Sequence, residues 1–214
     1  MKVTFPVDFW WGGATSGPQN EGRFHKPHVN VFDYHYDTKP EDFFRYVGPD
    51  VASDFYHLYE SDIALFKELG FNSLRTSIQW TRLIDDLEEG SLNPKGVAYY
   101  NRVIDALLAA GIRPIINLHH FDLPIELYER YGGWESKHVV ELFVKFACRA
   151  FECFGDRVTD WMTFNEPMVV VEGQYLYGFH YPMLVDGKKA VQVAYNLQLA
   201  SAKAIQAYRQ INQN

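Results

Sequence analysis

Residues 160–167 read DWMTFNEP, and the way this stretch ends decides the fold class. A run of apolar and β-branched residues stops at Asn165, Glu166 and Pro167. Proline donates no ladder hydrogen bond and favours extended geometry in the residue before it, so we expect a strand to end here with Glu166 in extended backbone. The carboxyl ends of parallel strands carry the chemistry of α/β proteins, which makes Glu166 a candidate catalytic residue.

Earlier segments repeat a pattern of one strand followed by one helix. Short apolar runs predict three more strands, at residues 9–15, 71–80 and 112–120. Apolar residues at helical spacing predict helices at residues 55–69, 94–110, 137–154 and 190–211. Ser53 or Asp54 is a suitable cap for the first of these helices, Asn93 for the second and Ser136 for the third. The segments 16–48, 121–135 and 172–188 have no clear period, and we expect irregular loops there.

Four consecutive strand–helix units predict a parallel sheet, because each helix returns the chain to start another strand in the same direction. An open doubly wound sheet normally carries a glycine-rich ligand loop after its first strand, and residues 12–17, GGATSG, match neither common form. Half of an eightfold barrel fits better, since a complete barrel takes about 250 residues. We therefore expect residues 1–214 to form one domain, the first half (four βα units) of a (β/α)8 TIM barrel, without its carboxyl-terminal half.

Composition excludes some classes of partner. The chain has 20 basic and 27 acidic residues, a net charge of -7, and no basic run, which argues against nucleic acid. No apolar stretch approaches the roughly 20 residues of a membrane span, and the first residues do not resemble a signal peptide, so we expect no membrane association and a cytoplasmic location. Cys148 and Cys153 are five residues apart on a predicted helix and point in different directions, which argues against a disulfide or a metal site between them.

Six motifs together resemble the amino-terminal half of glycoside hydrolase family 1. In order they are WGGATSGPQNEG (11–22), SDFYHLYESDIALFKELGFNSLRTSIQWTRL (53–83), NLHHFDLP (117–124), YGGW (131–134), FGDRV (154–158) and TFNEP (163–167). The resemblance covers nearly the whole chain in the family's order. It implies a (β/α)8 barrel that hydrolyses β-glycosides with retention of configuration, and it implies no cofactor or metal.

The resemblance also implies roles for five residues. Glu166 matches the general acid/base, which donates a proton to the glycosidic oxygen because an alkoxide is a poor leaving group. Asn165 matches the residue that bonds the sugar's 2-hydroxyl, and Gln19 and His120 match residues that bond other hydroxyls. Arg75 matches the arginine beside the nucleophile. Considered alone, Arg75 is equally consistent with a structural ion pair.

The chain departs from the family pattern in ways that affect function. A retaining mechanism needs a second carboxylate about 5 to 5.5 Å from the acid/base, and the family supplies it from the carboxyl-terminal half. We therefore expect this chain to be inactive alone and to pair with a complementary half or with itself. Phe121 and His119 replace a tryptophan and a tyrosine common in the family, and with SIQWTRL (77–83) they favour 6-phospho-β-glucosides over plain β-glucosides. The alternative is a stand-alone half-barrel that binds sugar or oligomerises without catalysis.

Other polar residues receive structural interpretations. Glu21, Glu126 and Glu172 are expected to be solvated carboxylates of the loops rather than the second catalytic group. His119, His120 and Asp122 suggest a metal cluster, but adjacent residues of a strand point to opposite faces. We expect His120 to face the barrel interior and His119 to pack outward.

Overall fold

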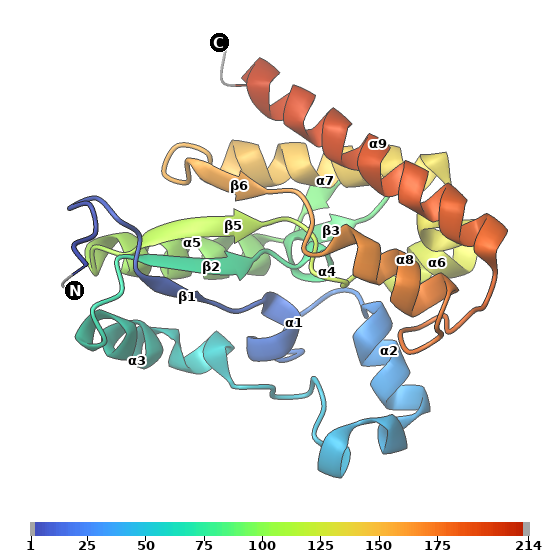
Figure 1. Cartoon of the computed structure of the whole chain (residues 1–214), viewed down its shortest axis with the longest axis horizontal. Coiled ribbons are helices and arrows are strands. Elements are labelled where there is room, and N and C mark those ends of the chain that lie inside the picture. The colour runs from blue at the N-terminus through green and yellow to red at the C-terminus, as the bar shows by residue number, and fades with distance from the viewer. Residues whose placement is uncertain (1–2, 212–214) are drawn as a thin grey trace.

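The computed structural model describes residues 3–211, which contain a four-stranded parallel sheet (Figure 1). Its strands are β1 (Gly12–Ala14), β2 (Ser73–Ser77), β5 (Arg113–Asn117) and β6 (Asp160–Met162), and they lie side by side in chain order. Every neighbouring pair of strands is parallel: β1 pairs with β2, β2 with β5, and β5 with β6. The four carboxyl ends consequently meet at one edge of the sheet.

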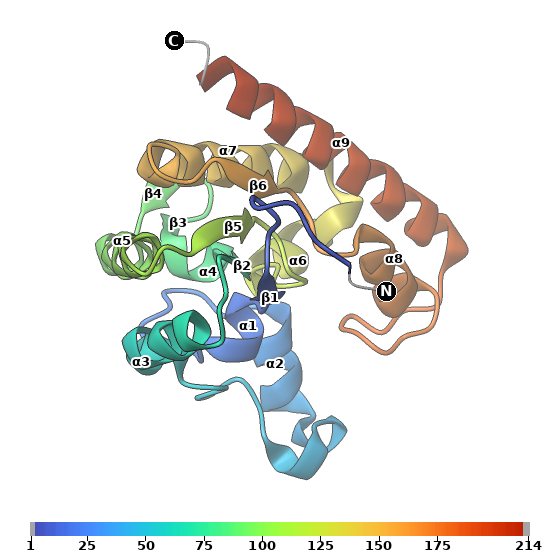
Figure 2. The same cartoon turned by 60° about the vertical axis from the view of Figure 1, so that its left-hand side comes forward.

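Long helices follow the strands and cover one side of the sheet. These are α3 (Phe55–Glu68), α5 (Pro94–Ala109) and α7 (Lys137–Phe154), which Figure 2 shows as an arc around the strands. The last helix, α9 (Gly187–Ile211), packs against α7 and against α8 (Pro167–Tyr175). The arrangement confirms the predicted alternation of strands and helices.

Aromatic side chains fill much of the core. The rings of Trp80 and Phe146 stack with their centroids 5.2 Å apart, and both side chains are buried. Phe143 stacks on Phe164 at 4.8 Å, which joins α7 to the segment after β6. These rings bury large apolar areas, so much of the aromatic content of the sequence serves packing.

Two of the three predicted helix caps are confirmed. The Asn93 side chain accepts a hydrogen bond from the backbone N–H of Lys95 at 3.2 Å, and Ser136 does the same for His138 at 3.1 Å. Asp54 precedes α3 but makes no capping hydrogen bond with its side chain. Its carboxylate is 2.6 Å from Nδ1 of His57 instead.

The predictions of irregular loops were wrong for residues 16–48 and 121–135, whereas most of the third segment, residues 176–186, contains no helix or strand. Residues 16–48 contain α1 (Gly17–Asn20), α2 (Val31–Thr38) and the 3-10 helices η1 (Pro40–Asp42) and η2 (Phe44–Tyr46). Residues 121–135 contain α6 (Ile125–Tyr131) and η3 (Gly133–Glu135), and residues 172–188 include the end of α8 and the start of α9. These pieces are short or lack a single apolar face, so a 3.6-residue period does not reveal them.

The strands are shorter than predicted, because the chain turns soon after each one. The segment predicted as a strand at 71–80 is paired only over β2, and it is followed by a helical turn, α4 (Trp80–Leu83). A small antiparallel pair, β3 (Ile84–Asp86) with β4 (Ser91–Leu92), follows and was not predicted. Among residues 3–211, no helix combines the length and apolar character needed to cross a bilayer.

A buried carboxylate links the segment after β1 to the segment after β2. Glu21 is 2% exposed, and its Oε2 accepts hydrogen bonds from Nε of Arg82 (2.8 Å), Nε2 of Gln79 (2.9 Å) and the hydroxyl of Tyr100 (3.1 Å). Burial acts to lower the pKa of Arg82, but Glu21, Tyr100 and Tyr99 together outweigh it and the net pKa is raised. The expectation of a solvated Glu21 was therefore wrong. Glu126 is half-buried against His28 rather than free.

The Glu21–Arg82 pair gives a stability prediction. Replacing Glu21→Gln leaves the Arg82 guanidinium buried without its carboxylate, which should lower the free energy of unfolding by about 3–5 kcal/mol. Chemical denaturation measures the change. Glu141→Gln is the control, because Glu141 pairs with Lys203 at an exposed position and its loss should cost less than about 1 kcal/mol. Equal losses in the two variants would contradict the importance of the buried pair.

Candidate functional site

The structure brings four of the predicted site residues into a line at the carboxyl edge of the sheet. Arg75 of β2 donates from one guanidinium nitrogen to Oδ1 of Asn165, which follows β6. Its other terminal nitrogen lies 3.4 Å from Nδ1 of His120, which follows β5, and 3.4 Å from the carbonyl of Thr15, which follows β1. Nδ2 of Asn165 donates to Oε2 of Glu166 at 3.4 Å. The line therefore spans all four strands.

Arg75 has no ion-pair partner in the described part of the chain. No carboxylate of residues 3–211 lies within ion-pair distance of its guanidinium, although the side chain is partly buried. The structural ion pair considered for Arg75 is thus not formed here. A partly buried guanidinium bonded only to neutral groups is suited to bind an additional anion or carboxylate.

Glu166 does not have the extended backbone expected of it. Its φ is 42° and its ψ is 63°, in the left-handed region, and its side chain is exposed. The backbone N–H of Asn165 is held by the carbonyl of His119 at 2.9 Å, while Pro167 begins α8. The chain must turn between these two points, so Glu166 takes the strained conformation. Proline at the first position of a helix is the sequence signal that was missed.

The two adjacent histidines, which follow β5, lie in different environments. His119 is buried, with its ring 5.2 Å from those of Trp134 and Phe164, and neither ring nitrogen has a partner among the described residues. Burial, with a smaller contribution from His120, lowers the pKa of His119 to about 3. Burial and then Arg75 lower the pKa of His120 to about 4. Both rings are therefore neutral at pH 7.

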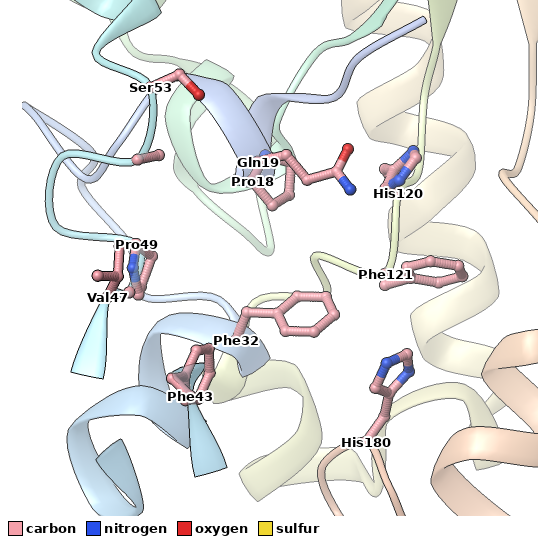
Figure 3. A pocket seen from close by; sticks show the side chains of 12 residues that line it. Pro18, Gln19, Phe32, Phe43, Val47, Pro49, Ser53, His120, Phe121 and His180 are labelled. Atoms are coloured by element: carbon pink, nitrogen blue, oxygen red, sulfur yellow. The ribbon is translucent and has the colours of Figure 1, made fainter. Parts of the chain in front are cut away.

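An open pocket of about 510 Å³ lies beside this line (Figure 3). Figure 3 shows the Gln19 amide and the His120 ring pointing toward the same space, with Phe32, Phe121 and His180 below them. The remaining lining residues are mostly apolar, namely Pro18, Phe43, Val47, Gly48, Pro49, Ala52 and Ser53. None of the described lining residues carries a carboxylate or a lysine or arginine side chain.

Prediction from sequence found one part of this site and missed another. Gln19 and His120 line the pocket, whereas Arg75, Asn165 and Glu166 lie outside its lining, and of these Arg75 contacts His120. Phe32 and His180 were missed because they belong to segments expected to be irregular. The capping box of Asn30 and Asp33 is a signal for α2 that was available in the sequence. Among residues 3–211, no group of His, Cys, Asp and Glu is arranged to hold a metal ion.

Comparison with known proteins identifies the family. The family model described as glycosyl hydrolase family 1 matches residues 1–214. The chain belongs to glycosyl hydrolase family 1. It is 49% identical over 215 residues to the 6-phospho-beta-glucosidase GmuD of Bacillus subtilis, covering 100% of this chain and 46% of that protein. Beta-glucosidase A of Acetivibrio thermocellus is 38% identical over 213 residues, with coverages of 99% and 47%.

Solved structures of the family give the same result for the fold. Aphid myrosinase superposes with a TM-score of 0.91 at 34% identity, covering 97% of this chain and 45% of that chain. This family 1 chain therefore has an α/β fold that corresponds to part of a TIM barrel, as predicted. It spans about half the length of the curated relatives that it matches.

The buried His119 gives a prediction for acid stability. Its folded pKa lies below its ordinary value of 6.5, so the unfolded state binds more protons and stability falls as the pH is lowered from about 6.5 toward 4. In His119→Phe, the slope of the unfolding free energy against pH should be smaller by up to about 1.4 kcal/mol per pH unit, because one fewer proton binds on unfolding. Unfolding free energies measured by denaturation between pH 4 and 7 provide the test. Identical slopes in the two proteins would contradict the neutral, buried state of His119.

Proposed function

We propose that this chain supplies the acid/base half of a retaining β-glycosidase that hydrolyses β-glucosides, with 6-phospho-β-glucosides preferred. The observation that carries the proposal is the line from Arg75 through Asn165 to Glu166 beside a pocket lined by Gln19 and His120. Membership of glycosyl hydrolase family 1 supports the reaction class, and the similarity to a 6-phospho-beta-glucosidase supports the preference.

In the proposed reaction, Gln19 and His120 bond sugar hydroxyls and Asn165 bonds the 2-hydroxyl. The neutral His120 ring has one N–H donor and one acceptor nitrogen, either of which suits a hydroxyl. The exposed carboxyl group of Glu166 donates its proton to the glycosidic oxygen as the bond to the anomeric carbon breaks. A second carboxylate forms the glycosyl-enzyme bond, and Glu166 then accepts a proton from the water that hydrolyses it.

The second carboxylate is proposed to come from a complementary half outside this chain. Arg75 supports this proposal, because its guanidinium faces the site without a carboxylate partner among residues 3–211. A carboxylate placed beside Arg75 would be held in its ionised, nucleophilic form. Residues 1–214 would then act as one domain, the amino-terminal half-barrel. A cytoplasmic location is part of the proposal, and the free thiols of Cys148 and Cys153 are compatible with a reducing compartment.

A second candidate is a half-barrel that binds sugar or self-associates without catalysis. The strands β1 and β6 each have one neighbour within the described sheet, so each leaves an unpaired edge. Large apolar side chains are also exposed near the amino terminus, at Phe5, Trp10 and Trp11. These surfaces favour association with a complementary half or with a second copy.

The assignment of Glu166 predicts an activity pattern. The chain alone should not hydrolyse nitrophenyl β-glucoside or its 6-phosphate, and mixing it with a separately expressed carboxyl-terminal half should restore turnover, faster on the 6-phosphate. In the mixture, Glu166→Gln should reduce the rate by about 10²- to 10⁴-fold, because the proton donor is lost. Glu172→Gln, on the neighbouring helix, is the control and should keep its rate. If the chain alone hydrolyses either substrate, and Glu166→Gln abolishes that activity, the proposal that the nucleophile lies outside this chain is refuted.

The exposed edges predict an association state. Size-exclusion chromatography with light scattering should show the 24.9 kDa chain as a dimer or larger species when it is alone. Addition of the complementary half should convert this species into a one-to-one complex. A stable, well-folded monomer of the isolated chain would contradict the prediction.

A further inference from the structure

We propose that Asp122 is a positioning residue that holds the His120 side chain in the pocket. After β5 the chain makes a tight turn over His120, Phe121 and Asp122. Oδ1 of Asp122 accepts a hydrogen bond from the backbone N–H of His120 at 2.8 Å, and the Asp122 side chain is buried, with 1% exposed. This hydrogen bond joins the first and last residues of the turn on its buried side.

This turn changes the direction of the side chains. In a regular strand, His120 and Phe121 would point to opposite faces. Phe121 instead has a φ of 66°, in the left-handed region that is unfavourable for a residue with a large side chain. As a result both His120 and Phe121 line the same pocket (Figure 3). A contact that stabilises the left-handed turn therefore determines where the His120 ring lies.

The peptide bond between His119 and His120 is held on both of its sides. Its carbonyl, from His119, accepts hydrogen bonds from Nδ2 of Asn117 at 2.8 Å and from the backbone N–H of Asn165 at 2.9 Å. Its N–H, from His120, donates to the Asp122 carboxylate. Loss of the Asp122 bond should therefore free the N–H side of this peptide, where the chain continues into Phe121, while the carbonyl side stays bonded.

Within residues 3–211, the side chain of Asp122 has a described hydrogen bond to one other residue, the N–H of His120. Its Oδ2 is buried and has no hydrogen-bond partner among residues 3–211. Burial raises the pKa of Asp122 to about 7, a shift that backbone hydrogen bonds and Lys26 partly oppose. Such a group is unfavourable for stability alone. Its one clear contact is the His120 N–H, and through His120 it influences Arg75.

The test follows the position of the His120 ring by NMR rather than turnover. The role of His120 as a sugar ligand rests on the proposed function, but the position of its ring does not, so failure of one proposal can be distinguished from failure of the other. In Asp122→Ala, exchange of the His120 backbone amide should accelerate by at least about tenfold, because its hydrogen bond is lost. The ring should move into solvent, and its pKa should rise from about 4 toward its ordinary value.

Asp122→Asn is the conservative variant, because it keeps an acceptor oxygen and removes the charge. Amide exchange and the His120 pKa should stay close to those of the unmodified chain. Asp86→Ala is the matched control: Oδ1 of Asp86 accepts the backbone N–H groups of Glu88 and Glu89 in another turn. That variant should accelerate exchange there and leave His120 unchanged.

Two results would overturn the proposal. One is an unchanged His120 amide and ring in a folded Asp122→Ala variant, and the other is Asp122→Asn behaving like Asp122→Ala. If Asp122→Ala does not fold, Phe121→Gly provides a second measurement, since glycine adopts the left-handed conformation without strain. The proposal then expects the Phe121→Gly/Asp122→Ala double variant to fold although Asp122→Ala alone does not, because the turn no longer contains a strained residue that Asp122 must hold. A double variant that also fails to fold would overturn the proposal.

Discussion

The buried carboxylate of Glu21 is the interaction on which the pocket depends. It is bonded by Arg82 and by the amide nitrogen of Gln79, and the amide oxygen of Gln79 in turn accepts hydrogen bonds from Asn30 at 3.2 Å and Lys26 at 3.3 Å. Glu21 follows Gln19 by two residues, and Asn30 caps the helix that carries Phe32. One connected polar network therefore holds two walls of the pocket in place.

The network also explains how a long connection keeps a defined shape. Residues 15–54 separate β1 from α3, and the helices in this stretch are all short. Short helices are marginal without tertiary contacts. The Arg82 guanidinium donates to the carbonyl of Gly22 at 3.0 Å and to that of Phe24, so it satisfies backbone groups of the connection as well as Glu21. Buried polar groups that are fully satisfied in this way favour one arrangement over alternatives.

Prediction from sequence succeeded where one local rule dominates. Helix starts at Asn93 and Ser136 depend on a single side-chain hydrogen bond. It failed where distant residues decide the outcome. The burial of Glu21 requires Arg82, 61 residues away, and no local pattern reveals that pairing. The backbone of Glu166 depends on the His119 carbonyl as well as on Pro167, so the rule for residues before proline was insufficient.

The predicted fold was confirmed for a similar reason. Within the four-stranded sheet, each strand pairs with the strand of that sheet that follows it in the sequence. The same alternation of an apolar strand and an amphipathic helix therefore recurs along the chain, and this recurrence predicts the fold. The prediction of most site residues depended on the family resemblance. Glu166 has a distinctive local pattern, at the end of a predicted strand before a proline. No such local pattern marks the other four, Gln19, Arg75, His120 and Asn165. Their roles remain part of the proposed function, while their placement around one edge of the sheet is an observation.

The order of the strands has a consequence for how the chain acquires its structure. Because β1, β2, β5 and β6 are adjacent in the order in which a ribosome makes them, each strand–helix unit can dock on units that have already emerged. Each of these pairings still joins residues far apart in the sequence, as Gly12 with Ser73 and Ser73 with Arg113, and parallel pairing of this kind is intrinsically slow. The sheet can thus grow from its amino-terminal side during translation, and β6 is the edge on which any strand made later would add.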